Sequence, residues 1–330
     1  MEPERLSFKG TDYLNITKNE EFRYFLAEGF KKYGSSFGGS RLSGNFADLY
    51  EEAETRLAEI SGAQASVSFS SGTLAGLALI KQLEKHELIY SPDAHPAIQP
   101  NHTQKTDKSY DEWVEFLLAT YHKQGKHLVL LSNSLNALKC EKYQFSWINE
   151  LAKHRKITIV IDDSHGFGIL GKNGAGIYNE LADSDHIEKI VISSLGKAWG
   201  IPGGVILGAD TLIEKLKKSA LFGGGSPVIP AYFNAFLKAE NIYTQNRKKL
   251  KDNIEYFKTK LDKPEMFHSF EGFPAFYTKH HEIYDLLNKK NIEISSFNYP
   301  SPEDERYTRI VLNSGHNHIE IDKLCNLLNK

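Results

Sequence analysis

A single lysine, Lys197, stands among small and apolar residues in the segment SSLGKAWG (193–200). It follows the apolar run KIVIS, which is typical of a buried strand. A lysine that is partly removed from water becomes a better nucleophile, because burial disfavours its charged form, and it can then form a Schiff base with an aldehyde. The alternative is a structural lysine whose stem lies on the sheet and whose ammonium group reaches water, which is favoured for an isolated lysine.

Two other polar groups follow predicted strands. The run SVSF leads into SSGT (70–73) and then into a predicted helix, so backbone N–H groups and hydroxyls there can hold an anion. A plain helix cap is the alternative.

Asp162 ends the apolar run ITIVI, and His165 follows three residues later. An acid at that place needs a donor or a cation, so Asp162 is expected to bind a metal, cap a loop or face a protonated ring nitrogen.

Together the three groups match the needs of one cofactor. Ligands of open α/β sheets bind beyond the carboxyl ends of the strands, and here an anion site, an aspartate and a lysine follow three separate strands. Pyridoxal 5′-phosphate (PLP) uses all three: the lysine binds its aldehyde, the aspartate keeps its ring nitrogen protonated, and the helix start holds its phosphate. A Walker-type nucleotide site is disfavoured, because Gly196 and Lys197 are followed by Ala198 and no glycine lies five residues before Gly196.

The elements that must position these groups alternate between strands and helices, which predicts an α/β core. Runs such as ITIVI lack polar alternation, as expected where helices cover both faces of a parallel sheet. The expected strands are 66–72, 127–133, 157–163, 189–194 and 203–208, and the expected helices are 46–60, 74–86 and 146–156.

Beyond about residue 233 the pattern changes. Residues 233–261 read as one long amphipathic helix, and shorter elements follow it, which indicates a smaller α+β domain. The predicted organisation is an N-terminal segment (1–33) that packs with the small domain or a partner subunit, a large PLP-binding domain (34–245) and a small C-terminal domain (246–330).

Composition excludes several classes of protein. The formal net charge of −2 gives no basis for binding nucleic acid or an anionic membrane, and no apolar stretch has the length of a membrane span. The start, MEPERLSFKG, is charged from its second residue, unlike a secretory signal. The two cysteines suit a reducing compartment and have no metal-ligand spacing. We therefore expect a cytoplasmic protein without a metal site.

With these residues in view, the sequence resembles the α-oxoamine synthases, a branch of the aspartate-aminotransferase-like (fold type I) PLP enzymes, and most resembles the members that form 8-amino-7-oxononanoate. The resemblance extends from about Asp12 to the C-terminal helix. It is strongest in four motifs, GGSRLSGNFADLYEEAETRLAEISG (38–62), FSSGTLAG (69–76), VIDDSHGFGILGKNGAG (160–176) and SSLGKAWGIPGG (193–204). It implies a large domain with a mostly parallel sheet covered by helices and a smaller α+β C-terminal domain.

The resemblance also implies roles for individual residues. Lys197 matches the lysine that binds the cofactor aldehyde and later moves the Cα proton, and Asp162 matches the partner of the ring nitrogen. His165 matches a residue near the ring oxygen, and His95 matches the histidine that stacks on the ring. Arg309 matches the arginine that receives the substrate carboxylate. Further positions match the phosphate-binding residues: Ser71, Gly72, Thr73 and Ser194.

Two positions on the substrate side depart from the family pattern. Thr11 stands where the family usually has an asparagine that helps bind the amino-acid carboxylate. Asn133, in LSNSLNALK (131–139), stands where the family has an acid, and the Met-Asp-Gly that usually follows is missing. We expect both residues to take part in substrate binding, with a geometry that differs from that of the family.

The resemblance implies a PLP-dependent C-acyltransferase that condenses a small amino acid with an acyl thioester, carried on coenzyme A or an acyl-carrier protein, and releases carbon dioxide. The expected pair is alanine and a pimeloyl thioester, giving 8-amino-7-oxononanoate for biotin synthesis. The alternatives are another α-oxoamine synthase that uses glycine or serine, a PLP transaminase or lyase, and a PLP-binding subunit or regulator without acyltransferase activity. A homodimer is expected, as is usual for this fold type.

Overall fold

Two sheets of different size organise the chain, for which a computed structural model describes residues 5–99 and 108–330. The large sheet has the strand order β2-β9-β8-β7-β4-β3. All neighbouring strands in it pair in parallel except β9, which is antiparallel to both β2 and β8. The predicted, mostly parallel sheet is therefore confirmed. Its strands are β2 (Ala65–Phe69), β3 (Leu88–Tyr90), β4 (Leu128–Asn133), β7 (Ile157–Asp162), β8 (Ile187–Ser194) and β9 (Gly204–Gly208).

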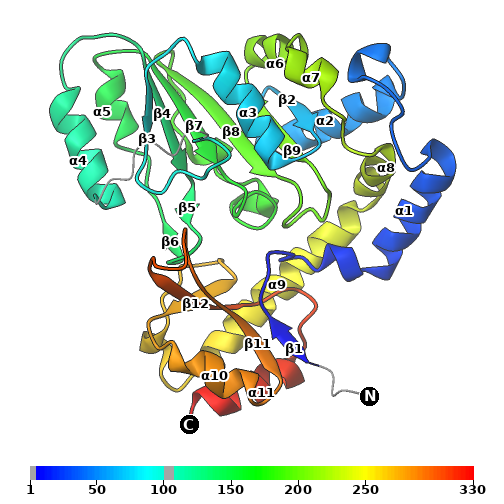
Figure 1. Ribbon diagram of the computed structural model, residues 1–330, viewed down its shortest axis with the longest axis vertical. Coiled ribbons are helices and arrows are strands. Elements are labelled where there is room, and N and C mark those ends of the chain that lie inside the picture. The colour runs from blue at the N-terminus through cyan, green and yellow to red at the C-terminus, as the bar shows by residue number, and fades with distance from the viewer. Residues whose placement is uncertain (1–4, 100–107) are drawn as a thin grey trace.

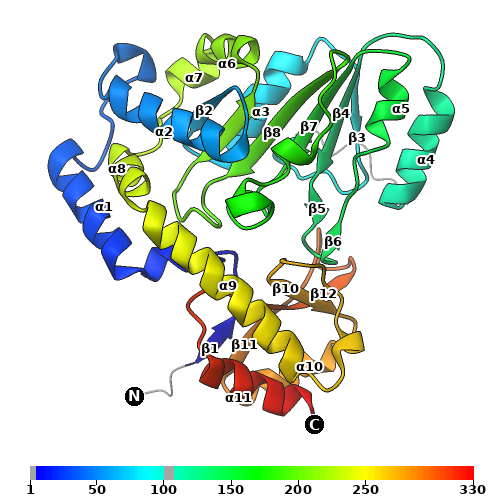
Figure 2. The ribbon, with the colours of Figure 1, turned by 180° about the vertical axis from the view of Figure 1, so that it is seen from behind.

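Helices cover both faces of the large sheet (Figures 1 and 2). In β7, Val160 points into one apolar core, while Ile159 and Ile161 point into the other. One face packs against α3 (Gly72–Leu83), α6 (Asp210–Lys217) and α7 (Ala220–Gly224), and the other against α2 (Ala47–Ser61), α4 (Tyr110–Thr120), α5 (Ile148–Ala152) and α8 (Pro230–Lys238). Burial on both faces explains why these strands are apolar throughout.

The small sheet has the order β1-β11-β12-β10 and lies at the opposite end of the molecule in Figure 1, close to both termini. Its strands are β1 (Leu6–Phe8), β10 (Ala275–Thr278), β11 (Ile292–Asn298) and β12 (Arg306–Val311), and the helices beside it are α9 (Glu240–Lys260), α10 (Glu282–Asn288) and α11 (His318–Leu328). β1 pairs in parallel with β11, so the start of the chain completes a sheet otherwise built from its end.

A hairpin of two short strands, β5 (Leu135–Asn136) and β6 (Glu141–Lys142), runs from the large sheet toward β12 (Figure 1). Five single turns of 3₁₀ helix complete the described secondary structure: Ile16–Lys18, Arg41–Ser43, Lys172–Gly174, Tyr178–Glu180 and Pro264–Met266.

The long helix predicted for residues 233–261 is wrong. Two helices occupy this stretch, α8 and α9, and they meet at the buried residue Ala239, whose φ of −96° and ψ of 15° interrupt the helix. Alanine favours helices, so the local sequence contains no signal for the break. Tertiary packing causes it, because α8 packs against α1 (Glu20–Tyr33) and α2 whereas α9 continues to the small sheet and packs against α11. The helix predicted for 146–156 is also shorter than expected, since α5 spans only Ile148–Ala152.

The division into 1–33, 34–245 and 246–330 stays a prediction. β1 joins the small sheet, whereas α1 (Glu20–Tyr33) packs against α8. Among the described residues, no helix is long and apolar enough to cross a membrane.

The contact between α1 and α8 depends on Gly29. A Cβ atom on this buried residue would lie 2.7 Å from Ala231 Cα and 2.8 Å from Ala231 O, both backbone atoms that cannot move aside cheaply. Gly29→Leu is therefore expected to lower the free energy of unfolding by about 1–3 kcal/mol through overpacking. Urea denaturation measures this change. Ala27→Leu, at an exposed position of the same helix, is the control and should change stability little; equal stability of the two variants would contradict the account of this contact.

Candidate functional site

The carboxyl ends of β3, β4 and β7 meet at one edge of the large sheet, where Asn133 and Asp162 are paired neighbours. Between this edge and the small sheet lies a cavity of about 760 Å³. The structure brings six of the predicted site residues to its wall: His95, Asn133, Asp162, His165, Lys197 and Arg309.

Lys197 lies in a tight loop between β8 and β9. The loop is closed by backbone hydrogen bonds from Leu195 N to Gly203 O (2.9 Å) and from Ile201 N to Leu195 O (2.9 Å). Burial lowers the pKa of Lys197, and the negative charge of Asp162 opposes this effect. A lysine with a lowered pKa holds a larger fraction of free amine at neutral pH, and that is the form needed for attack on an aldehyde and for accepting a proton.

The two adjacent acids of the DDSHG segment point in different directions. Asp162 lines the cavity, and its Oδ1 accepts a hydrogen bond from Ser164 N (2.9 Å). Asp163 is fully buried away from the cavity, where its Oδ2 accepts a hydrogen bond from Ile177 N (2.8 Å), and burial raises its pKa to about 7. Asp162 is therefore the acid available to a ligand, while Asp163 holds the loop that carries His165.

His165 is held by a residue that the sequence analysis did not select. The Tyr13 hydroxyl lies 2.7 Å from His165 Nδ1. Burial lowers the pKa of His165 well below its ordinary value, and the charges of Lys197 and Arg309 lower it further, so the ring is neutral. A neutral imidazole offers one donor and one acceptor nitrogen. Since Tyr13 occupies Nδ1, Nε2 is the nitrogen left for a ligand.

His95 is the most exposed of these residues, with half of its side chain accessible. Its Nδ1 accepts a hydrogen bond from Ala97 N (3.1 Å) and lies 3.7 Å from Asp162 Oδ2. Its backbone N–H donates to Asn133 Oδ1 (3.0 Å). The ring is thus attached to a fixed loop and faces the same space as Asp162.

Arg309 approaches the cavity from the small sheet, on β12. Its Nη1 donates to Ala137 O, and its guanidinium group lies 5.6 Å from the centre of the Phe297 ring. Its buried Nε has no hydrogen-bond partner within residues 5–99 and 108–330. A buried, unpaired donor on a cation fits an anionic ligand such as a carboxylate.

The predicted phosphate-side residues lie beside the cavity wall rather than on it. Ser71 caps α3 by accepting a hydrogen bond from Leu74 N (3.0 Å), which leaves the first N–H groups of the helix, those of Gly72 and Thr73, without intrahelical partners. A Cβ atom on Gly72 would lie 3.1 Å from Ser194 Cβ, so the glycine allows Ser194 to sit directly against the helix start.

These features fit PLP. Backbone donors and hydroxyls at the start of α3 suit a phosphate, a partly buried lysine suits an aldehyde, and the Asp162 carboxylate suits a protonated ring nitrogen. The unpaired Arg309 nitrogen suits the carboxylate of a substrate.

Thr11 does not line the cavity. The residue after it, Asp12, accepts hydrogen bonds from Ile16 N (2.9 Å) and Thr17 N (3.2 Å) and so fixes the turn before α1. A role for Thr11 in substrate binding stays a prediction.

Several lining residues were missed by the sequence analysis. Asp93 lies two residues before His95 and borders the cavity, and its position next to a selected histidine was the only signal for it. Tyr13 belongs to the TDYL segment, in which only Thr11 was selected. Aromatic residues from the small sheet complete the outer wall: Phe297, Tyr299 and Tyr307.

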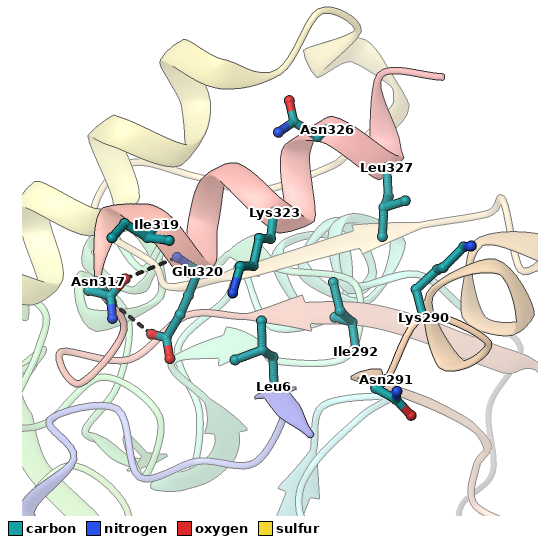
Figure 3. Close-up of a pocket in the computed structure, with 10 residues that line it drawn as sticks. All are labelled: Leu6, Lys290, Asn291, Ile292, Asn317, Ile319, Glu320, Lys323, Asn326 and Leu327. Carbon is teal, nitrogen blue, oxygen red and sulfur yellow. Dashed lines mark hydrogen bonds between the residues drawn. The ribbon is translucent and has the colours of Figure 1, made fainter. Parts of the chain in front are cut away.

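A second cavity, of about 630 Å³, lies at the outer edge of the small sheet, between β1, β11 and α11 (Figure 3). Leu6, Ile292 and Leu327 form its apolar part. Its carboxylate, Glu320, is already used in the N-terminal cap of α11, where it accepts a hydrogen bond from Asn317 N (2.9 Å). This cavity therefore lacks the paired chemical groups of the site at the large sheet.

Residues 114–328, more than half of the chain, match the aminotransferase class I and II family. The 8-amino-7-oxononanoate synthase of Petrotoga mobilis is 27% identical over 344 residues, covering 96% of this chain and 86% of the relative. The structure is similar to 8-amino-7-oxononanoate synthase from Francisella tularensis, with a TM-score of 0.75, 22% identity and coverage of 98% of this chain and 97% of that one. It is also similar to a serine palmitoyltransferase from S. paucimobilis with a bound PLP–myriocin aldimine, with a TM-score of 0.81, 16% identity and coverage of 98% and 86%. The predicted fold type I architecture and the resemblance to the α-oxoamine synthases are confirmed.

Removing the Tyr13 hydroxyl tests how far the site depends on the orientation of His165. Tyr13→Phe keeps the buried ring but leaves His165 Nδ1 without its partner. The loss of one hydrogen bond of ordinary strength should raise the Kd for PLP by roughly 2- to 10-fold, as measured by titrating the cofactor-free protein. Tyr24→Phe, which removes an exposed hydroxyl from α1, is the control. An unchanged Kd in Tyr13→Phe would show that this contact does not position the ring.

Proposed function

The chain belongs to the aminotransferase class I and II family of PLP-dependent enzymes, and we propose that it is a C-acyltransferase that joins a small amino acid to an acyl thioester. The observation that carries this proposal is a single cavity in which a partly buried lysine, a strand-end carboxylate and an arginine with an unpaired nitrogen meet. Lys197, Asp162 and Arg309 supply these groups from three different elements.

When bound, PLP supplies the electron-withdrawing ring that makes removal of a substrate Cα proton feasible. Asp162 holds the proton on the ring nitrogen, a role supported by its buried, strand-end position on the wall of the cavity. Lys197 Nζ accepts the Cα proton, because its lowered pKa leaves the amine neutral more readily than that of a surface lysine. The start of α3, with Ser71, Thr73 and Ser194 around it, binds the phosphate.

Arg309 and the two histidines orient the reacting groups. The Arg309 guanidinium group binds the amino-acid carboxylate, which its unpaired Nε supports. Tyr13 fixes Nδ1 of His165, so that Nε2 would be available to the cofactor ring, and His95 would hold the ring from its loop. The aromatic outer wall offers apolar surface to the acyl chain.

The reaction balances without a redox partner. The Cα carbon of the amino acid forms a bond with the thioester carbonyl carbon, and the carbon–sulfur bond breaks to release a thiolate, which takes a proton from solvent. Loss of the carboxylate as carbon dioxide and return of a proton from Lys197 to Cα give the aminoketone. The products are one aminoketone, one carbon dioxide and one thiol.

The proposed substrates are alanine and a pimeloyl thioester, on coenzyme A or a carrier protein, with 8-amino-7-oxononanoate as the product for biotin synthesis. The names of the relatives support this pair.

The proposed setting is the cytoplasm and the proposed assembly is a homodimer. Two exposed apolar side chains support a subunit contact: Leu77 on α3 (39% exposed) and Leu42 in the 3₁₀ turn Arg41–Ser43 (68%).

A matrix of substrates tests the reaction. PLP-loaded protein is mixed with alanine, glycine or serine and with acyl-coenzyme A or acyl-carrier-protein donors, and thiol release and product mass are measured. Thiol release with alanine and a pimeloyl donor, accompanied by the mass of the aminoketone, is expected. Lys197→Ala should lower the rate at least about 100-fold, because it removes the group that accepts the proton. Lys218→Ala, at an exposed lysine of the same domain, should retain the rate.

Other outcomes of the matrix would replace the proposal. Thiol release only with glycine or serine indicates a different α-oxoamine synthase. A keto acid formed without any thioester indicates a transaminase. Bound PLP without turnover of any pair indicates a PLP-binding subunit or regulator.

A further inference from the structure

Asn133, the last residue of β4, departs from the acid that the family resemblance leads one to expect. Its side-chain amide makes two hydrogen bonds to one loop. Asn133 Oδ1 accepts from His95 N (3.0 Å), and Asn133 Nδ2 donates to Asp93 O (2.6 Å). Both ends of the amide are therefore used by the backbone of the loop that carries His95.

We propose that Asn133 is a positioning residue for the His95 loop rather than a substrate-binding residue. The proposal rests on the proposed function, in which His95 lies over the cofactor ring. The two contacts need one donor and one acceptor, and an amide supplies both. An ionised carboxylate has acceptors only, so it would keep the bond from His95 N but would face the carbonyl oxygen of Asp93 without a proton between them.

The side chain of Asp93 fixes the same loop from the other side. Its Oδ2 accepts a hydrogen bond from the Tyr143 hydroxyl (2.6 Å), and its Oδ1 accepts one from Ser91 Oγ (3.3 Å). The Tyr143 ring stacks on Tyr110, with their centres 3.9 Å apart. The loop is thus attached through its backbone to β4 and through a carboxylate to a stacked tyrosine, so that His95 has a defined place above Asp162.

The charges around position 133 explain why an amide is preferred there. Asp93 comes from the loop after β3, and Asp162 is the paired neighbour of Asn133 on β7. Other charged or titratable side chains line the same cavity: Lys197, His95, His165, Asp304, Glu305 and Arg309. An acid at position 133 would add a third carboxylate directly beside Asp93 and Asp162, whereas the positive charges of the cavity come from Lys197 and Arg309. Asn133 keeps the hydrogen bonds and adds no charge.

The decisive variants are Asn133→Asp and Asn133→Ala. At neutral pH both should increase amide hydrogen exchange across residues 91–99 in the cofactor-free protein and raise the Kd for PLP roughly 10-fold. At lower pH the introduced acid becomes neutral and can both donate and accept, as the amide does. The adjacent carboxylates raise the pKa of the introduced acid above that of a free aspartate, so this change should appear as the pH falls below neutral. Asn133→Asp should then return to within about threefold of the wild-type protein measured at the same pH, whereas Asn133→Ala should not.

Asn317→Asp is the matched control. Asn317 caps α11 far from the cavity by accepting a hydrogen bond from Glu320 N (3.0 Å), and aspartate caps a helix equally well. This variant should match the wild-type protein in both measurements at every pH.

Three results would overturn the proposal. The first is hydrogen exchange and a Kd for PLP in Asn133→Asp that equal those of the wild-type protein at neutral pH. The second is a pH profile that is the same in Asn133→Asp and Asn133→Ala, and the third is a change in the KM for the amino acid alone. The last result would restore a substrate-binding role. The exchange measurement needs neither cofactor nor substrate, so it remains decisive for the loop even if the substrate matrix disproves acyl transfer.

Discussion

The register of β4, β7 and β8 is the constraint on which the site depends. Parallel pairing places Asn133 beside Asp162 and Asp162 beside Ile192, so that the polar groups that follow each strand emerge at one edge. A shift by one residue would exchange the faces of every side chain in β7. The apolar packing on both faces prevents that shift, because Val160 and Ile161 belong to different cores. The position of the Asp162 carboxylate is therefore set by the hydrophobic core rather than by the loop that follows.

Burial then sets the protonation state of the groups that this edge brings together. It lowers the pKa of both Lys197 and His165, so the lysine holds more free amine than a surface lysine and the imidazole stays neutral. The negative charge of Asp162 raises the pKa of Lys197 and so opposes the effect of burial. The small sheet contributes a positive charge, that of Arg309 on β12. Residues from both sheets therefore line the cavity. The packing of α9 against α11 and the pairing of β1 with β11 thus help to hold the sheet that carries Arg309.

The sequence predicted those features of the structure that depend on residues close together in the chain. Fully apolar runs predicted the buried strands, and the polar residues at their ends predicted Asp162, His165 and Lys197 at one site. It was uninformative where a long-range contact decided the outcome. Tyr13 reaches His165 across 152 residues of chain, and nothing in TDYL indicates that partner. The break at Ala239 likewise results from long-range packing, of α8 against α1 and α2 and of α9 against α11. Asn133 was placed with the substrate because its family position suggested this, whereas its hydrogen bonds lead to the His95 loop.

The central claim is that the lysine between β8 and β9 binds the cofactor covalently. Borohydride reduction of the PLP-loaded protein, followed by proteolysis and mass mapping, tests this claim directly. One phosphopyridoxyl group is expected, attached to the peptide that contains Lys197, and it should be absent from Lys197→Ala. A label spread over surface lysines, or a label on another single lysine, would contradict it.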